Sequence, residues 1–416
     1  MNYPESVRFL YALGNEIKTA KFGLERMRQL CDALGNPERA CRLVHVAGTN
    51  GKGSTCAMIE AGLRAAGLRT GLYTSPHLVE PTERIQVAGA PVSHEQFAAA
   101  FDHVHETAER LLQDGRIDLH PTYFETVTAM AFVLFRELKC EIVVLEVGLG
   151  GRLDATNVVM PELCVITPID YDHEQYLGRT IEAIAGEKAG ILKRGTPAIF
   201  ARQRSEAECV LINRARKLDI QFDRVADHRL ERIRVEAHGS EFELDGRAVT
   251  CPLAGEHQIE NAATAALALS HLQAPVAGLA RTVWPGRLER LAEDPEIILD
   301  GAHNPAGARA LAAYIERFYR RRRIWLIYGS MRDKAVEEIE GALFPLAHCV
   351  IATAPRFARA LRPEAIRDLW PEGNVLVADT IDRAIAIARD RATPGDAIFI
   401  TGSLFLVGEA RALLLQ

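Results

Sequence analysis

The feature of this sequence that most constrains its fold is a repeated alternation of short apolar runs with longer helical segments. The runs "RLVHVAG" (42–48), "CEIVVLEVG" (140–148) and "ELCVITPID" (162–170) are rich in Val, Ile and Leu, which is typical of strands buried on both faces. The segments at 55–67 and 93–113 predict helices, the second opening with a serine cap. Strands that alternate with helices usually pair in parallel, so the sequence predicts an α/β fold with a mostly parallel sheet.

The middle of the chain changes character between about residues 218 and 252. The segments "IQFDRV", "LERIRVEAHG" and "EFELDGRAVTC" alternate apolar and polar residues around turns, which predicts a small antiparallel patch. The segment 273–291 then mixes Pro and Gly with a short helix, and we place a domain boundary inside it. The sequence thus predicts a larger domain over residues 1–284, which carries this patch, and a smaller Rossmann-like α/β domain over residues 285–416.

The composition narrows the class of protein. Of the 416 residues, 48% are hydrophobic and 25% are charged, and the formal net charge is −6. This balance favours neither nucleic acid nor a membrane surface as a partner. The eight cysteines are scattered singly, and the first residues lack the basic run and cleavage site of a signal peptide. We therefore expect a cytoplasmic protein with reduced thiols, and no membrane span, because no apolar stretch approaches the roughly 20 residues that a span needs.

The segment "GTNGKGST" (48–55) lies between a predicted strand and a predicted helix, where a phosphate-binding P-loop belongs. Gly48, Gly51 and Gly53 allow backbone N–H groups to approach an anion, and Lys52 can neutralise phosphate charge. The common P-loop, G-x-x-x-x-G-K-[ST], places a hydroxyl directly after its lysine to bind Mg²⁺, whereas here that position is Gly53. The segment predicts a nucleotide site and leaves open which residue holds the metal.

Polar side chains follow several of the predicted strands. A carboxylate at the carboxyl end of a parallel strand faces the crevice in which α/β proteins bind ligands, so Glu146 is a candidate Mg²⁺ ligand. His173 follows the next strand and is expected to face the same crevice. Asp300 and His303 lie in a turn between a strand and a helix, and Arg287 lies just past the domain boundary. Together they predict a ligand site between the two domains.

Several segments, in this order, together resemble one known family. They are "HVAGTNGKGST", "TSPHL", "TYFE", "LEVGLGGRLDATN", "DHEQYLG", "GEKAGILK", "GRLE", "LDGAHNPAG" and "TGSLFLVGE". They are similar to those of folylpolyglutamate synthase/dihydrofolate synthase, the folate branch of the Mur-type amide ligases, from about residue 20 to the end. The resemblance implies an ATP-dependent C–N ligase, in which ATP converts a substrate carboxylate to an acyl phosphate and the amine of L-glutamate attacks it. Closure of two domains around the substrates would keep water from the acyl phosphate.

The resemblance also implies the nucleotide, metal and catalytic residues. The implied nucleotide contacts are Thr49, Asn50, Gly51, Lys52, Gly53, Ser54, Asn261, Arg287 and Asp300. Two Mg²⁺ ions are implied, the first held by Ser54, Ser75 and Glu146 and the second by His173 and Lys188, with Glu146 as a bridge. The implied catalytic residues are Lys52, Lys188, His173 and His303.

The resemblance reverses the interpretation of Lys188. Taken alone, the segment "GEKAGILK" predicts that Lys188 is a lysine on the surface of a helix. The family carries this lysine as a carbamate, which turns a cation into an anionic metal ligand. Because carbamate formation requires the neutral amine, the lysine pKa, ordinarily about 10.4, must be lowered by its surroundings or the carbamate trapped by metal.

The implied substrates are dihydropteroate, reduced folates and L-glutamate. The dihydropteroate pocket is implied to contain Thr122, Phe124, Glu125, Leu153, Asp154 and Ala155, with Phe124 placed to stack on a pterin ring. The loop around Lys21 and Phe22 is expected to close over this pocket, and His303 and Ser403 are implied to receive glutamate. We expect a monomer that has dihydrofolate synthase activity and also extends folates, although product chain length cannot be derived from the sequence.

Two other functions fit parts of the pattern. A Mur-type cell-wall ligase would share the nucleotide loop, but "TYFE" and "GLGGRLDATN" favour a folate substrate. A P-loop switch that binds GTP would also share the loop, but it would carry an N-K-x-D segment to recognise guanine, which the sequence lacks.

Overall fold

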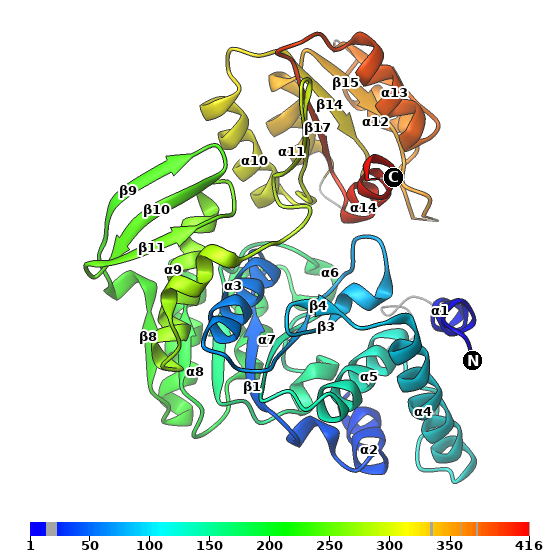
Figure 1. The fold of residues 1–416 in the computed structure, drawn as a ribbon, viewed down its shortest axis with the longest axis vertical. Helices are drawn as coiled ribbons and strands as arrows, with labels where there is room; N and C mark the ends of the chain where they lie inside the picture. Colours follow the sequence, from blue (N-terminus) through cyan, green and yellow to red (C-terminus); the bar gives the residue numbers. More distant parts are fainter. Residues whose placement is uncertain (14–22, 333–335, 358, 372, 416) are drawn as a thin grey trace.

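The computed structural model describes residues 1–13, 23–332, 336–357, 359–371 and 373–415. Figure 1 shows an N-terminal unit, coloured blue to green, beside a C-terminal unit, coloured yellow to red. The predicted division between residues 284 and 285 falls between the 3-10 helix η6 (Val276–Arg281) and strand β12 (Glu289–Glu293). No described helix has both the length and the apolar character that a membrane crossing demands.

The N-terminal unit is built on a mixed sheet that, within the described residues, has eight strands. Its order is β4 (Ala90–Pro91), β3 (Ile85–Val87), β2 (Thr70–Tyr73), β5 (Ile142–Glu146), β1 (Arg42–Ala47), β6 (Leu163–Ile166), β7 (Ala198–Phe200) and β8 (Phe222–Arg224). Strands β2, β5, β1, β6, β7 and β8 run parallel to one another. Strands β3 and β4 pair antiparallel at the edge beside β2. The mostly parallel sheet predicted from the sequence is therefore confirmed.

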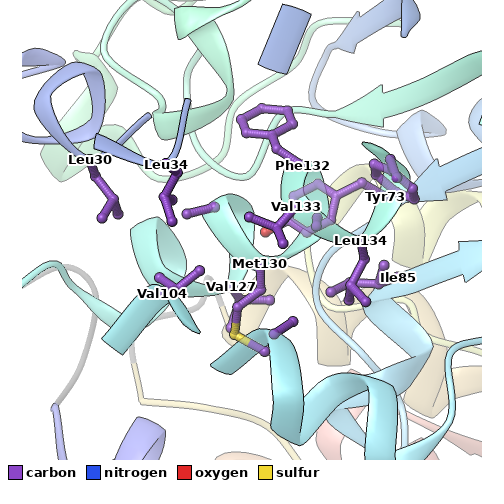
Figure 2. Close-up of a cluster of buried hydrophobic side chains, with 14 of the residues drawn as sticks. Leu30, Leu34, Tyr73, Ile85, Val104, Val127, Met130, Phe132, Val133 and Leu134 are labelled. Carbon is purple, nitrogen blue, oxygen red and sulfur yellow. The ribbon is translucent and has the colours of Figure 1, made fainter. Parts of the chain in front are cut away.

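Alternate side chains of the central strands enter different hydrophobic clusters on the two faces of this sheet. Val143 and Leu145 of β5 pack in one cluster with helices α2 (Glu25–Ala33), α4 (His94–Gln113) and α5 (Tyr123–Glu137), part of which Figure 2 shows. Val144 packs in the other cluster with α3 (Lys52–Ala65) and α9 (His257–His271). Burial on both faces explains why these strands appear in the sequence as unbroken apolar runs.

Shorter helices complete the N-terminal unit. They are α1 (Tyr3–Ala12), α6 (Glu174–Leu177), α7 (Ile181–Lys188) and α8 (Ser205–Leu218), with the 3-10 turns η1 (Pro37–Arg39), η2 (Pro81–Arg84), η3 (Ala155–Val158), η4 (Ala189–Ile191) and η5 (Val225–Asp227). Figure 1 shows α1, α4 and α5 together at one corner of this unit.

A separate antiparallel sheet forms most of the predicted patch. Its order is β11 (Arg247–Cys251), β10 (Gly239–Leu244) and β9 (Leu230–Glu236). The prediction is wrong for "IQFDRV" (220–225), because β8 pairs in parallel with β7 of the main sheet. Helix α8 makes the crossover that brings β8 back parallel to β7. A run this short shows too little periodicity to reveal which partner it pairs with.

The C-terminal unit is a smaller α/β layer structure. Its sheet has the order β12, β13 (Glu296–Leu299), β17 (Ala397–Thr401), β14 (Ile324–Tyr328), β15 (Cys349–Ala352) and β16 (Val375–Val377), parallel except at β12. Its helices are α10 (Pro305–Phe318), α11 (Val336–Leu343), α12 (Pro363–Leu369), α13 (Ile381–Arg391) and α14 (Leu404–Leu414), with the turn η7 (Phe344–Leu346). The predicted fold class, two α/β sheets with a small antiparallel patch, is confirmed.

Strands of both units lead at their carboxyl ends into one region. Strand β1 is followed by the phosphate loop, and α3 begins at Lys52 within that loop. Strand β5 ends at Glu146, β13 is followed directly by Asp300, and Ser403 lies two residues beyond β17. Because open α/β sheets bind ligands beyond the carboxyl ends of their strands, this arrangement places the candidate site between the two units.

Candidate active site

A cavity of about 840 Å³ is lined by both units. It brings together all the site residues predicted from the sequence that the structure describes; Phe22 and Lys21 lie outside the described residues. Those lining it are Thr49, Asn50, Gly51, Lys52, Gly53, Ser54, Ser75, Thr122, Phe124, Glu125, Glu146, Leu153, Asp154, Ala155, His173, Lys188, Asn261, Arg287, Asp300, His303 and Ser403.

The phosphate loop needs glycine for two different reasons. Gly51 has φ 81°, and a Cβ there would lie 2.1 Å from Oδ1 of Asn261. A Cβ on Gly53 would lie 2.8 Å from the ring of Trp284. Glycine is therefore needed at position 51 because the backbone there is left-handed. It is needed at position 53 because the Trp284 ring packs directly against the backbone.

The lysine and serine of the loop face the same cavity. Lys52 donates a hydrogen bond from Nζ to the carbonyl oxygen of Thr49, across 3.1 Å. The Ser54 hydroxyl is buried and accepts a hydrogen bond from Nε2 of Gln258, across 3.3 Å. The start of α3, whose N–H groups favour anions, thus presents a cation and a hydroxyl within one helical turn.

Glu146 is a buried carboxylate among cations. Its side chain is 4% exposed, and it accepts the backbone N–H of Ser75 across 3.1 Å. Burial raises the pKa of Glu146, and the opposing charge of Lys52 is the largest influence that lowers it. A buried carboxylate is stabilised by a bound cation, and its oxygens are the ligand type that Mg²⁺ prefers.

Lys188 lies inside the site and not on a helix surface. It is 4% exposed and donates from Nζ to the carbonyl oxygen of Gly48, across 2.7 Å. Burial, reinforced by the neighbouring Lys52, lowers the pKa of Lys188 to about 7, although Asp172 and Asp154 oppose the shift. The surface position expected from "GEKAGILK" alone is wrong, because α7 ends at Lys188 against the loop that contains Gly151, where a Cβ would lie 2.8 Å from the carbonyl oxygen of Glu187.

A polar cluster joins the two units beside the phosphate loop. The side-chain Nδ2 of Asn304 donates to Oδ1 of Asn50 across 2.9 Å and to Oδ2 of Asp172 across 3.4 Å. The same Asp172 oxygen lies 3.8 Å from Nε2 of His173 and 3.9 Å from Nε2 of His303. The two histidines predicted from the sequence therefore surround one carboxylate, and the cluster has the ligand types that a divalent cation uses.

The C-terminal unit contributes a cation and a carboxylate. Asp300 accepts hydrogen bonds from the backbone N–H groups of Leu288 and Ala302, each across 3.0 Å. Burial raises the pKa of Asp300, and Arg287 opposes this effect. Burial also lowers the pKa of Arg287, against the attraction of Asp300 and Glu146. Arg287 lines the cavity, and a guanidinium group there can bind a phosphate through paired hydrogen bonds.

The wall predicted to bind pterin is made by α5 and the glycine-rich loop after β5. Phe124 packs against that loop so closely that a Cβ on Gly148 would lie 2.4 Å from Cζ of the Phe124 ring. Glu125 caps the helix by accepting the N–H of Thr122 across 2.8 Å, and it also pairs with Arg26 across 3.0 Å, where both side chains are less than a tenth exposed. Glu125 thus stabilises this wall by holding the start of α5 and by joining it to Arg26 of α2.

Asp154, in the loop after β5, is also held by hydrogen bonds. It accepts hydrogen bonds from the backbone N–H groups of Leu149 (2.8 Å) and Thr156 (3.0 Å). Burial raises the pKa of Asp154 to about 6 despite these bonds. Its backbone contacts fix the loop that carries Leu153 and Ala155 into the cavity.

Sequence reasoning missed several residues of the cavity wall. Arg26 and Arg84 bring positive charge to the side with Phe124, and His257 and Gln258 lie at the start of α9 near Ser54. Burial lowers the pKa of His257 to about 4. Asp172, by contrast, is indicated by the sequence together with His173, because the two residues follow the same predicted strand. The others lie within helical segments, where nothing in the local pattern distinguishes a cavity-facing residue from a surface one.

Comparison with known proteins places this geometry in a family. Residues 46–269 match the model of the Mur ligase middle domain, and residues 286–404 match that of the Mur ligase, glutamate ligase domain. The dihydrofolate synthase/folylpolyglutamate synthase of Bacillus subtilis is 37% identical over 411 residues, which cover 95% of each chain.

Two solved structures are similar over the whole chain. The Mycobacterium tuberculosis folylpolyglutamate synthase complexed with ADP and AMPPCP has a TM-score of 0.91 at 35% identity, covering 100% of this chain and 99% of that one. The E. coli FolC in complex with DHPP and ADP has a TM-score of 0.87 at 30% identity, covering 100% and 98%. The chain therefore belongs to the Mur ligase family, in its dihydrofolate synthase/folylpolyglutamate synthase branch.

Proposed function

We propose that this protein is an ATP-dependent ligase that joins L-glutamate through an amide bond to dihydropteroate and also to reduced folates. The observation that carries the proposal is the cavity between the units, in which the phosphate loop, Glu146 and the turn with Asp300 and His303 lie together. Full-length similarity to dihydrofolate synthase/folylpolyglutamate synthase supports the same activity.

The reaction proceeds in two balanced steps. A carboxylate oxygen of the folate precursor attacks the γ-phosphorus of ATP, the bond to the β-phosphate oxygen breaks, and ADP leaves. The amine nitrogen of glutamate then attacks the acyl carbon, and inorganic phosphate and one proton are released. Enclosure between two units keeps water from the acyl phosphate, which would otherwise be hydrolysed.

The nucleotide is held from both units. Residues 49–54 and the start of α3 bind the triphosphate, with Lys52 supplying positive charge. Asn261, Arg287 and Asp300 complete the nucleotide site, with Arg287 on phosphate and Asp300 near the adenosine end. Charge that develops on the transferred phosphoryl group is stabilised by groups already in place, so little rearrangement is needed during the reaction.

The donor set fits two Mg²⁺ ions. Ser54, Ser75 and Glu146 would hold the first, and their oxygens are the ligands that Mg²⁺ prefers. His173 and Lys188, as a carbamate, would hold the second, with Glu146 as a bridge. Mg²⁺ bound there neutralises charge on the phosphoryl oxygens.

We expect Lys188 to react with CO₂ and form a carbamate. A protonated amine cannot ligate a cation, but a pKa lowered to about 7 leaves a large neutral fraction at physiological pH. The neutral nitrogen adds to the carbon of CO₂, one proton is released, and the product is an anion. This change adds two oxygen atoms beyond Nζ, which lies close to Gly48 of the phosphate loop.

The other substrates occupy opposite ends of the cavity. Phe124 would stack on the pterin ring, with the remaining contacts from Thr122, Glu125, Leu153, Asp154 and Ala155. Glutamate would enter from the C-terminal unit beside His303 and Ser403. We further propose that the protein acts as a monomer in the cytoplasm, where its cysteine thiols stay reduced.

One assay tests the proposal. The protein is supplied with ATP, Mg²⁺ and glutamate and with either dihydropteroate or a tetrahydrofolate monoglutamate, and the products are weighed by mass spectrometry. A product heavier by one glutamyl residue with each acceptor supports both activities, and a product with dihydropteroate alone restricts the enzyme to dihydrofolate synthase. Turnover with a muramyl nucleotide and with neither folate acceptor would instead assign a cell-wall ligase.

A further inference from the structure

A second cluster of potential metal ligands lies at the corner formed by α1, α4 and α5 (Figure 1). It consists of His105, Glu109 and His120, and one donor atom from each lies within 4.8 Å of the others. His105 and Glu109 are one turn apart on α4, so they share a helix face, and His120 lies three residues before α5 begins at Tyr123. None of these three residues lines the cavity described above.

The spacing of the donor atoms suits a tetrahedral metal ion. Nδ1 of His105 lies 3.3 Å from Nε2 of His120, and that nitrogen lies 3.9 Å from Oε1 of Glu109. Zinc–nitrogen bonds of about 2.0–2.1 Å at tetrahedral angles separate neighbouring donors by about 3.4 Å. The two nitrogens already have this separation. Glu109, whose side chain is 45% exposed, would have to move closer to the two nitrogens to bind the same ion.

A hydrogen bond orients His120 as a ligand. Its Nδ1 lies 2.8 Å from the carbonyl oxygen of Pro121, and because a carbonyl can only accept, Nδ1 must carry the proton. In the neutral ring, Nε2 then has a free electron pair directed at His105. Such an outer hydrogen bond to a backbone carbonyl is the usual companion of a metal-binding histidine.

Aromatic neighbours hold both imidazole rings in place. The centroid of the His105 ring lies 4.5 Å from that of Phe9 on α1, and 5.4 Å from that of Phe101 with the planes 11° apart. The His120 ring lies 5.7 Å from Phe9. Because the rings are already ordered, binding an ion costs little side-chain entropy.

From these contacts we infer that His105, Glu109 and His120 bind one divalent transition-metal ion of the zinc class, with water in the fourth position. The ion replaces the proton between the two rings, and the neutral His105 ring carries its proton on Nε2 instead. Two imidazoles select zinc over Mg²⁺, which prefers oxygen ligands. The ion would fasten α4 to the residues that precede the Thr122 cap of α5, so its role is structural and distinct from the reaction.

Metal titration of the full chain tests this inference. The chelator-treated protein is titrated with ZnCl₂ by calorimetry in millimolar Mg²⁺, and with CoCl₂ while visible absorption is recorded. We expect one zinc equivalent, a tetrahedral cobalt spectrum and a higher thermal midpoint with zinc. Glu109→Gln and His105→Gln should each lower the affinity for zinc by about tenfold or more. His103→Ala changes an exposed histidine on the same helix and should leave the zinc affinity unchanged.

The variants also separate this site from adventitious binding. Zinc held at His173 and His303 in the cavity would survive both His105→Gln and Glu109→Gln, and such a result would overturn the inference. Absence of a zinc equivalent in the unmodified chain would overturn it as well. Glu109→Gln is nearly isosteric and half-exposed, so its circular dichroism and thermal midpoint in chelator should match those of the unmodified chain.

Discussion

The side-chain amide of Asn304 donates a hydrogen bond to the side chain of Asn50, across 2.9 Å and from the C-terminal unit to the phosphate loop. Asn304 also caps α10 by accepting the N–H of Gly307 across 2.8 Å. The residue that starts a helix in one unit therefore contacts the nucleotide loop of the other. This contact couples the relative position of the two units to the geometry of the phosphate site.

Replacing Asn304 separates its two roles. Asn304→Asp keeps a good helix cap, but it removes the amide donor and places a carboxylate beside Asp172. We expect the free energy of unfolding to stay within about 1 kcal/mol of the original, while kcat falls about tenfold, equivalent to about 1.4 kcal/mol. Denaturant unfolding and steady-state kinetics measure the two effects. An unchanged kcat in Asn304→Asp would show that this contact has no role in turnover.

Lys52→Ala should almost abolish turnover without unfolding the protein. The lysine supplies positive charge at the phosphate loop, and loss of such a preorganised group costs about 10²- to 10³-fold in kcat. The matched control is Lys217→Ala, an exposed lysine on α8, which should keep the original rate. ATP turnover in the presence of dihydropteroate and glutamate is the measurement. Comparable rates for the two variants would show that Lys52 does not act on phosphate.

Glu146→Gln should remove most of the Mg²⁺-dependent activity and weaken the binding of Mg²⁺. The amide can still accept the N–H of Ser75, but it lacks the charge that binds a cation. We expect a loss of about 10²-fold or more in kcat and a thermal midpoint at least equal to the original, because burial raises the pKa of the native carboxyl group. A Mg²⁺ titration of activity would contradict the assignment if the variant retained the original half-saturation point.

Lys188 should make the stability of CO₂-depleted protein depend on pH. Burial lowers its pKa to about 7 in the folded chain, whereas an unfolded lysine has a pKa of about 10.4. Between these values the unfolded chain binds more protons, so the free energy of unfolding rises as pH increases from about 7 to about 10. Lys188→Met should lose this slope, and denaturant unfolding across the pH range measures it.

The same residue should link activity to bicarbonate. Carbamate formation consumes the neutral amine, so at a fixed concentration of dissolved CO₂ reactivation of depleted enzyme should be faster at pH 8 than at pH 6. Lys188→Met should stay inactive at every bicarbonate concentration. Full activity of depleted enzyme at pH 8 without bicarbonate would contradict the carbamate.

Phe124→Leu should affect one substrate selectively. The ring lies against the loop at Gly148, and loss of an aromatic stack costs about 0.5–1.5 kcal/mol. We therefore expect KM for dihydropteroate to rise about threefold to tenfold, while KM for ATP stays constant. Initial rates with each substrate varied in turn separate these values. A rise in KM for ATP alone would place the pterin elsewhere.

Much of the site was predictable because its residues follow strands. Glu146, His173 and Asp300 end or follow parallel strands, and topology alone brings such positions to one edge of a sheet. The glycines of the phosphate loop were recognisable for a similar reason, since a strand-to-helix turn has few ways to approach an anion. These signals are local in the sequence and need no knowledge of tertiary packing.

The remainder depends on contacts between distant segments. Nothing near Arg26 in the sequence indicates that it pairs with Glu125, because 99 residues separate them. Lys188 appears as a surface lysine in the sequence, but in the fold its Nζ donates to Gly48 of the phosphate loop. Strand β8 is too short to reveal its partner. In each case tertiary packing determines the position, and a local pattern cannot encode it.

Whether the reaction passes through an acyl phosphate can be tested most directly by following oxygen atoms. Dihydropteroate labelled with ¹⁸O in its carboxyl group is incubated with the protein, ATP, Mg²⁺ and glutamate, and both products are analysed by mass spectrometry. An acyl phosphate pathway predicts dihydrofolate together with inorganic phosphate that carries one ¹⁸O atom, because the carboxylate oxygen that attacks ATP leaves with the phosphate. Amide product accompanied by unlabelled phosphate would contradict an acyl phosphate, and the absence of any glutamyl product would contradict the assigned activity itself.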